Sequence, residues 1–132
     1  MADKLHFSLV SPERELVSKE VDAVDIPGVE GLLGILPNHA PFMTILAPGI
    51  VILKNGNEQE KFLVRGGFAE VTPAGLTVLA EEATPVTELD KSSIDGHLSR
   101  AREELSEAGD NAEKSLGAQQ NIECLEELQK SL

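Results

Sequence analysis

Three histidines and one cysteine are the residues of this chain whose side chains most often bind metals or take part in catalysis. His6 falls in a segment with strand-like alternation, His39 in a loop rich in glycine and proline, and His97 in a segment with helical spacing. Their separations fit no metal-binding motif, and no serine or cysteine nucleophile motif accompanies His39. We therefore expect no catalytic residue, no metal site and no cofactor, and for His39 a hydrogen bond within its loop or a contact with a partner.

Two other patterns resemble sites but lack the residues that such sites need. The pair Gly66-Gly67 is not followed by the lysine or the helix start that a phosphate-binding loop requires. The pairs Glu81-Glu82 and Glu126-Glu127 are typical of solvated faces. Side-chain chemistry therefore favours a binding or structural protein over an enzyme.

Composition limits the partners and the compartment. The chain has 132 residues and a net charge of −12, which argues against binding to nucleic acid or to an anionic membrane surface. The single Cys124 excludes an internal disulfide and favours a reducing compartment. No apolar run of about 18 residues could span a bilayer, and the first residues lack a signal-peptide pattern. We expect a cytosolic protein that reaches a membrane only through a partner, without inserting into it.

Short strands with turn residues between them fill the first two thirds of the chain. Leu5, Phe7 and Leu9 alternate with polar residues, as in a half-buried strand, and Asn55-Gly56 predicts a two-residue hairpin turn. This spacing predicts one antiparallel β-sandwich or flattened barrel over residues 1–86. We expect a chain break near Lys19–Asp22, strands near Leu33–Leu36 and Phe42–Leu46, a continuously buried strand at Gly49–Leu53, and a break or bulge at Arg65–Phe68.

Apolar residues beyond Pro85 follow helical spacing. Ile94, Leu98, Ala101, Leu105 and Ala108 form one narrow stripe, and Leu116, Ile122, Leu125, Leu128 and Leu132 form a looser one. Asp90 is a candidate N-cap, Gly109 a candidate helix end, and Asp110 with Glu113 a second helix start. An antiparallel helical hairpin over residues 87–132 follows, so the fold class is α+β. Because each stripe is narrow, we expect the hairpin to pair with itself or to lie on the sandwich, not both, and to detach readily.

The segment Gly28–Pro41 combines three glycines, two prolines and five branched apolar residues. One interpretation is a tight connection between strands whose apolar residues fill the core. The other is a docking loop, shaped in advance so that association costs little ordering entropy.

Three segments together resemble the epsilon subunit of the F-type ATP synthase. Glu30-Gly31-Leu32-Leu33-Gly34-Ile35-Leu36-Pro37-Asn38-His39-Ala40-Pro41 is similar to the family's Glu-Gly-x-Leu-Gly-Ile-x-Pro-x-His-Ala-Pro signature. Arg65–Val71 resembles its Gly-Gly-Phe-x-Glu-Val strand, and Leu76–Ala80 the strand that follows. The resemblance covers nearly the whole chain.

The resemblance implies a non-catalytic rotor subunit on the cytoplasmic face of the membrane, whose sandwich binds the gamma stalk and the membrane c-ring. It places the expected partner contacts at Glu30, Gly31, Leu32, Leu33, Gly34, Pro37, Asn38, His39 and Pro41. We expect Leu32 and Leu33 to be the apolar anchors. Many members of the family carry a carboxylate where this chain has Leu32, so we expect no salt link from that position.

A regulatory role for the hairpin is the alternative that the resemblance implies. Some bacterial members bind ATP through Ile/Leu-Asp-x-x-Arg-Ala, whereas here Arg100 follows Asp95 by five residues, which turns the two side chains apart by roughly 140°. In other members the hairpin extends toward the alpha and beta subunits and inhibits ATP hydrolysis, helped by basic residues. The second helix here holds only Lys114 and Lys130 as basic residues, so we expect weak inhibition. A free-standing sandwich that binds an unrelated small ligand is a third interpretation.

Overall fold

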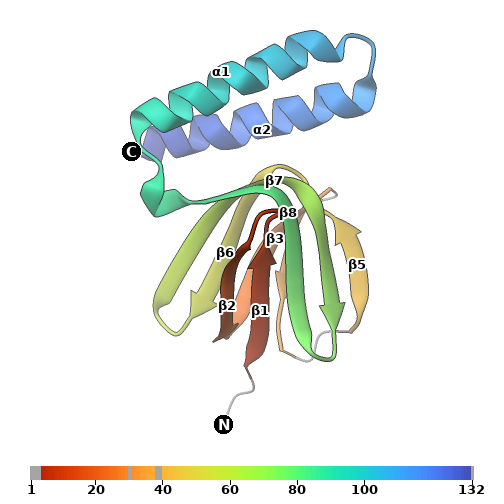
Figure 1. The fold of residues 1–132 in the computed structure, drawn as a ribbon, viewed down its shortest axis with the longest axis vertical. Helices are drawn as coiled ribbons and strands as arrows, with labels where there is room; N and C mark the ends of the chain where they lie inside the picture. The colour runs from red at the N-terminus through yellow and green to blue at the C-terminus, as the bar shows by residue number, and fades with distance from the viewer. Residues whose placement is uncertain (1–3, 30, 38–39, 132) are drawn as a thin grey trace.

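The structure, a computed structural model, describes residues 4–29, 31–37 and 40–131. A β-sandwich comes first in the chain, and two antiparallel helices lie across one end of it (Figure 1). The elements are β1 (Leu5–Val10), β2 (Glu15–Val21), β3 (Ala23–Gly28), β4 (Gly31–Ile35), β5 (Phe42–Ile45), β6 (Gly49–Asn55), β7 (Glu58–Thr72), β8 (Gly75–Pro85), the 3₁₀ turn η1 (Val86–Glu88), α1 (Lys91–Ala108) and α2 (Ala112–Ser131). The expected α+β fold, a sandwich followed by a helical hairpin, is confirmed.

The strands form one sheet that wraps around the core. Their order is β2-β1-β8-β7-β6-β3-β4, and β5 pairs with β7 outside this path. Among the described strands, β1 and β8 form a parallel pair, with Phe7 opposite Leu76, while the other pairs are antiparallel. The first and last strands of the chain, β1 and β8, therefore lie side by side within the sheet.

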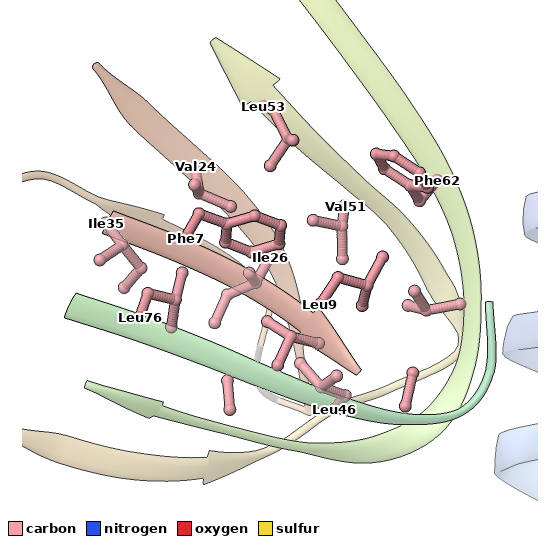
Figure 2. Packing of buried hydrophobic residues seen from close by; sticks show 14 of the residues in the cluster. Phe7, Leu9, Val24, Ile26, Ile35, Leu46, Val51, Leu53, Phe62 and Leu76 are labelled. Atoms are coloured by element: carbon pink, nitrogen blue, oxygen red, sulfur yellow. The ribbon is translucent and has the colours of Figure 1, made fainter. Parts of the chain in front are cut away.

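Alternation along the strands builds the core, as the sequence predicts. Leu5, Phe7 and Leu9 of β1 are buried, and Figure 2 shows the labelled side chains of several strands meeting in one interior. The strand β6 departs from the prediction, because Val51 is buried but its neighbour Ile50 is only partly so. The prediction of a continuously buried strand at Gly49–Leu53 is therefore wrong, since only one face of β6 is turned to this core.

The chain break between β2 and β3 falls at Asp22, within the predicted range. The Asp22 carboxylate accepts a hydrogen bond from the Gly56 N–H at 2.6 Å and pairs with Lys4. The bond from Lys4, followed by that from Gly56, lowers the pKa of Asp22 below its ordinary value. Asn55 pairs with Glu58, so the hairpin turn is centred on Gly56 and Asn57, one residue later than predicted. Gly56 has a φ of 64°, which favours glycine there.

The glycine pair at positions 66 and 67 bends β7 without ending it. Before the bend, Val64 pairs with Gly49 of β6, and after it, Phe68 pairs with Ile45 of β5. Gly67 has a φ of 113°, and a Cβ atom there would overlap the Leu79 carbonyl. The expected break or bulge is thus a bend at which one continuous strand changes partner.

The helix ends follow capping chemistry. Asp90 accepts a hydrogen bond from the Ser93 N–H at 2.7 Å, as predicted for the N-cap of α1, and Gly109, with a φ of 55°, follows the last residue of that helix. The second helix is capped by Asn111, whose Oδ1 accepts from the Lys114 N–H at 3.0 Å, so Asp110 as its start is wrong by one residue. Of the second predicted stripe, Leu116 is 57% exposed and Leu132 lies outside the described residues.

The hairpin packs against the sandwich and against itself. Phe62, Leu63 and Val64 are buried in succession, because the first and third face the main core while Leu63 faces the helices. Leu63 joins a second cluster that holds Leu89, Ile94, Leu98, Ala101 and Leu125. The prediction that the stripes are too narrow for both contacts is wrong, since α1, α2 and β7 share a single cluster. The readiness of the hairpin to detach stays a prediction.

Candidate docking surface

A first group of exposed apolar side chains lies on and beside β4. Within the described residues this strand pairs with β3 alone, at the end of the sheet, so its other edge has no strand partner there. Leu32 is 66% exposed and Leu33 is 36% exposed, and Val29 and Leu36 are exposed beside them. Ile35, by contrast, is buried in the core. The core-filling interpretation of the Gly28–Pro41 segment therefore holds for Ile35 but not for its exposed neighbours, and the docking-loop interpretation stays a prediction.

A second group lies on the outer face of β5, β7 and β8. Ile45 is opposite Phe68, and Phe68 is opposite Leu79, so the three side chains form a row across the sheet. All three are exposed, and Met43 is exposed two residues before Ile45 on the same face. No pattern in the sequence predicts this row. Alternation assigns Ala69 to the core and hence Phe68 to the outside, but only the register between strands brings Ile45 and Leu79 beside it.

A groove of about 430 Å³ lies beside the first group. Val29, Leu32 and Leu33 line it, together with Thr44 of β5, whereas the residues of the second group do not line it. We refer to the two groups together as the docking surface, which consists of Val29, Leu32, Leu33, Leu36, Met43, Ile45, Phe68 and Leu79. Exposed apolar side chains that gather on a surface are typical of interaction sites.

The partner contacts predicted from the sequence fall partly on this surface. Gly31, Leu32, Leu33 and Gly34 are exposed on β4. Pro37, which lies after β4, is partly buried, and Pro41, which directly precedes β5, is exposed. The predicted contacts Glu30, Asn38 and His39 lie outside the described residues.

The residues considered for nucleotide binding do not come together. Asp95 accepts a hydrogen bond from Gln129 Nε2 at 2.7 Å, which ties α1 to α2. Arg100 instead pairs with Glu82 of β8 and lies 3.8 Å from Glu104 on its own helix. Both partners of Arg100 are carboxylates, so its charge is already compensated.

Arg100 belongs to a closed ring of alternating charges that joins the hairpin to the sandwich. Arg65 of β7 pairs with Glu104 of α1, and its guanidinium lies 3.8 Å from Glu82. Glu82 in turn pairs with Arg100. Each charge of this ring faces two opposite ones, which stabilises the set more than an isolated surface pair would be stabilised.

His6 has two polar partners, and Cys124 is partly buried. His6 Nδ1 lies 3.1 Å from Glu20 Oε1, and its Nε2 lies 3.4 Å from the Ser18 hydroxyl. Burial, with a smaller contribution from the charge of Glu127, raises the pKa of Cys124 to about 11, so its thiol is protonated at neutral pH. In the described part of the chain, no three histidine, cysteine or carboxylate side chains are placed to hold a metal ion. Among the same residues, no helix is long and apolar enough to cross a bilayer.

A β-sandwich with an exposed apolar surface and a docked helical hairpin defines a binding module. Residues 4–86 match the family model of the ATP synthase delta/epsilon chain, beta-sandwich domain. The chain is 50% identical to the ATP synthase epsilon chain of Hyphomonas neptunium, over 100% of this chain and 98% of that one. It is 47% identical to that of Parvibaculum lavamentivorans over the full length of both.

Solved structures agree with this assignment. A chain of the Euglena gracilis mitochondrial ATP synthase, in a structure of OSCP, F1 and c-ring, is similar with a TM-score of 0.73 and 25% identity, over 97% of this chain and 81% of that one. A chain of the Tetrahymena thermophila central stalk and c-ring shares the fold, with a TM-score of 0.67 and 14% identity, over 97% and 98%. The chain belongs to the ATP synthase epsilon family, whose members are accessory subunits without an active site of their own.

Proposed function

We propose that this stalk subunit grips the gamma subunit and the membrane c-ring through the docking surface, and so passes ion-driven rotation on to ATP synthesis. The single observation that carries the proposal is the set of large apolar side chains that the sandwich leaves exposed. Burying them in a partner interface would be favourable by roughly 25 cal/mol for each Å² of apolar area removed from water.

The build of the molecule supports a mechanical role. Much of the docking surface lies on strands whose backbones are joined by the hydrogen bonds of the sheet. It therefore needs little ordering when a partner binds. Glu70 lies opposite Met43 and adds a charge beside the apolar row, which a basic residue of a partner would complement. As part of a membrane-associated complex, the protein would sit at the cytoplasmic face.

Substitution of the docking surface tests this proposal. Phe68→Asp and Leu32→Asp each place a charge on an exposed position, so the isolated chain should fold as before. We expect each to weaken co-purification with gamma or with detergent-solubilised c-ring by tenfold or more, and to lower ATP synthesis by the reconstituted complex. Leu116→Asp is the matched control, because Leu116 is 57% exposed, between Phe68 at 38% and Leu32 at 66%, but lies on α2. Unchanged assembly of both docking-surface variants would refute the proposal.

Inhibition of ATP hydrolysis is the second function to test. Extension of the hairpin would require the charge ring and the second cluster to separate, and α2 carries Glu113, Glu123, Glu126 and Glu127 against Lys114 and Lys130. We therefore infer weak inhibition, and no ATP site at Asp95 and Arg100. Deleting residues 88–132 should change ATP hydrolysis by the complex less than about twofold, and a several-fold rise would contradict this.

A further inference from the structure

The turn between β6 and β7 holds an asparagine followed by a glycine, the pair at which asparagine side chains deamidate most readily. In this reaction the backbone nitrogen of the second residue attacks the side-chain carbonyl carbon of the first, and glycine obstructs that approach least. Asn55 is the last residue of β6, and Gly56 follows it in the turn. A Cβ atom placed on Gly56 would meet nothing within 4 Å, so no packing contact covers this position. The docking surface does not include the pair, so the proposed function gives it no role.

Both groups that react in a deamidation bind one ion pair, formed by Lys4 and Asp22. The Lys4 ammonium donates to Asn55 Oδ1 at 2.8 Å, and the Gly56 N–H donates to Asp22 Oδ2 at 2.6 Å. We refer to these four residues as the turn cluster. Because Lys4 and Asp22 are paired with each other, the Asn55 side-chain amide is held on the side of the backbone toward which the Gly56 N–H points.

Each member of the ion pair carries the charge that this reaction needs. A cation at a carbonyl oxygen draws electrons from the carbonyl carbon and stabilises the oxyanion that forms when a nucleophile adds. A carboxylate that accepts a hydrogen bond from an N–H can take its proton as the nitrogen attacks. The bond from Lys4, followed by that from Gly56, lowers the pKa of Asp22, so this carboxylate is ionised at neutral pH.

We propose that the turn cluster makes Asn55 a site of self-catalysed deamidation in the folded chain. The Gly56 nitrogen passes its proton to Asp22 and forms a bond to Asn55 Cγ, while Lys4 stabilises the oxyanion on Oδ1. The bond from Cγ to the side-chain amide nitrogen then breaks, and this nitrogen takes the proton from Asp22 and leaves as ammonia. Water opens the resulting cyclic imide at either carbonyl carbon, which leaves an aspartate or an isoaspartate at this position.

Either product changes the turn in which it forms. A new carboxylate would lie beside that of Asp22 and add one negative charge to a chain that already carries −12. An isoaspartate would also lengthen the backbone by one carbon atom and so disturb the pairing of Asn55 with Glu58. Because Asp22 lies between β2 and β3, the modification would loosen two junctions of the sandwich together.

Incubation of the full chain at neutral pH, with and without urea, tests the proposal. Trypsin cleaves after Lys54 and Lys61, and mass spectrometry of the released residues 55–61 measures the deamidated fraction at each asparagine. General acid–base catalysis by positioned side chains contributes about 10²–10⁴-fold in rate, and because the turn cluster is exposed we expect Asn55 to deamidate about tenfold faster in the folded chain than in urea. Asn57 lies in the same peptide but outside the turn cluster, so folding should not accelerate its deamidation.

Substitutions separate catalysis by the ion pair from exposure of the turn. Lys4→Gln and Asp22→Asn remove one charge each at similar size, so each should lower the rate at Asn55 to about that in urea. Lys4→Arg keeps the charge and should keep much of the acceleration. Lys91→Gln removes an exposed lysine at the start of α1 and is the matched control, which should leave the rate unchanged.

The comparison of the folded chain with the chain in urea uses no substitution, so it decides the proposal even where a variant fails to fold. Circular dichroism identifies the variants that do fold. A rate at Asn55 that is equal or lower in the folded chain than in urea would overturn the proposal. An equal effect of Lys91→Gln and Lys4→Gln, or a folded Asp22→Asn chain that deamidates as fast as the unmodified one, would do the same.

Discussion

Replacing Leu63 with alanine tests whether the second cluster, where the helices contact β7, holds the hairpin on the sandwich. Leu63 is 6% exposed and belongs to the second cluster, with Ile94, Leu98 and Leu125 of the helices, but not to the main core. When the hairpin opens, this side chain becomes exposed to water. The truncation therefore weakens the docked state and leaves the open sandwich nearly unaffected.

The magnitude follows from the burial. Truncation of a buried leucine to alanine costs about 2–5 kcal/mol. We take about 2 kcal/mol, because the second cluster lies between the sandwich and the hairpin, where the surrounding side chains can relax. A loss of that size raises the open population of the hairpin by about thirtyfold. Native-state hydrogen exchange of amides in α1 and α2 should accelerate by that factor, while amides of β1 and β8 should not change.

A core substitution provides the comparison. Leu53 lies in the main cluster and is 1% exposed, so Leu53→Ala should accelerate exchange in the strands through global unfolding. Equal acceleration of strands and helices in Leu63→Ala would refute a separable hairpin. An acceleration of amide exchange in the helices by less than about threefold would show that the second cluster does not hold the hairpin on the sandwich.

Three further outcomes follow from single residues. Gly67→Ala should lower the free energy of unfolding by about 3 kcal/mol or more in urea titrations, because its Cβ would collide with a neighbouring carbonyl in a positive-φ conformation. The hydrogen bond from the Ser93 amide lowers the pKa of Asp90 below 3.8, so its capping contribution is complete above the unfolded pKa and lost as pH falls through the folded one. Helix content by circular dichroism should therefore fall on acidification below about pH 4, and less so in Asp90→Asn. Burial and the charge of Glu127 raise the pKa of Cys124 to about 11, so iodoacetamide should alkylate it roughly 100-fold more slowly in the native chain than in urea at pH 8.

Local signals in the sequence predicted the elements well. The alternation of Leu5, Phe7 and Leu9 and the cap at Asp90 each depend on neighbours within a few residues, and the structure confirms them. Glycines announce irregular backbone, but Gly66 and Gly67 do not reveal whether a strand ends or changes partner. That outcome depends on β5 and β6, which are distant in sequence from the bend.

Contacts between distant segments could not be predicted in the same way. The row of Ile45, Phe68 and Leu79 exists only through the register of three strands, so no window of the sequence contains it. Leu116 fits a helical stripe but is exposed, while Asn121 is buried, because the position of α2 over the sandwich decides which face is covered. The segment with the strongest sequence signal, Gly28–Pro41, did supply half of the docking surface.

The strand β7 carries both contact regions of this molecule on one backbone. Leu63 and Arg65 meet the helices on one side of the bend, and Phe68 meets solvent on the other, only three residues beyond Arg65. A side chain at Gly67 would overlap the Leu79 carbonyl, so the close contact of β7 and β8 at the bend requires glycine. A load applied to Phe68 would therefore reach Leu63 and Arg65 along the backbone of β7, without passing through a loop.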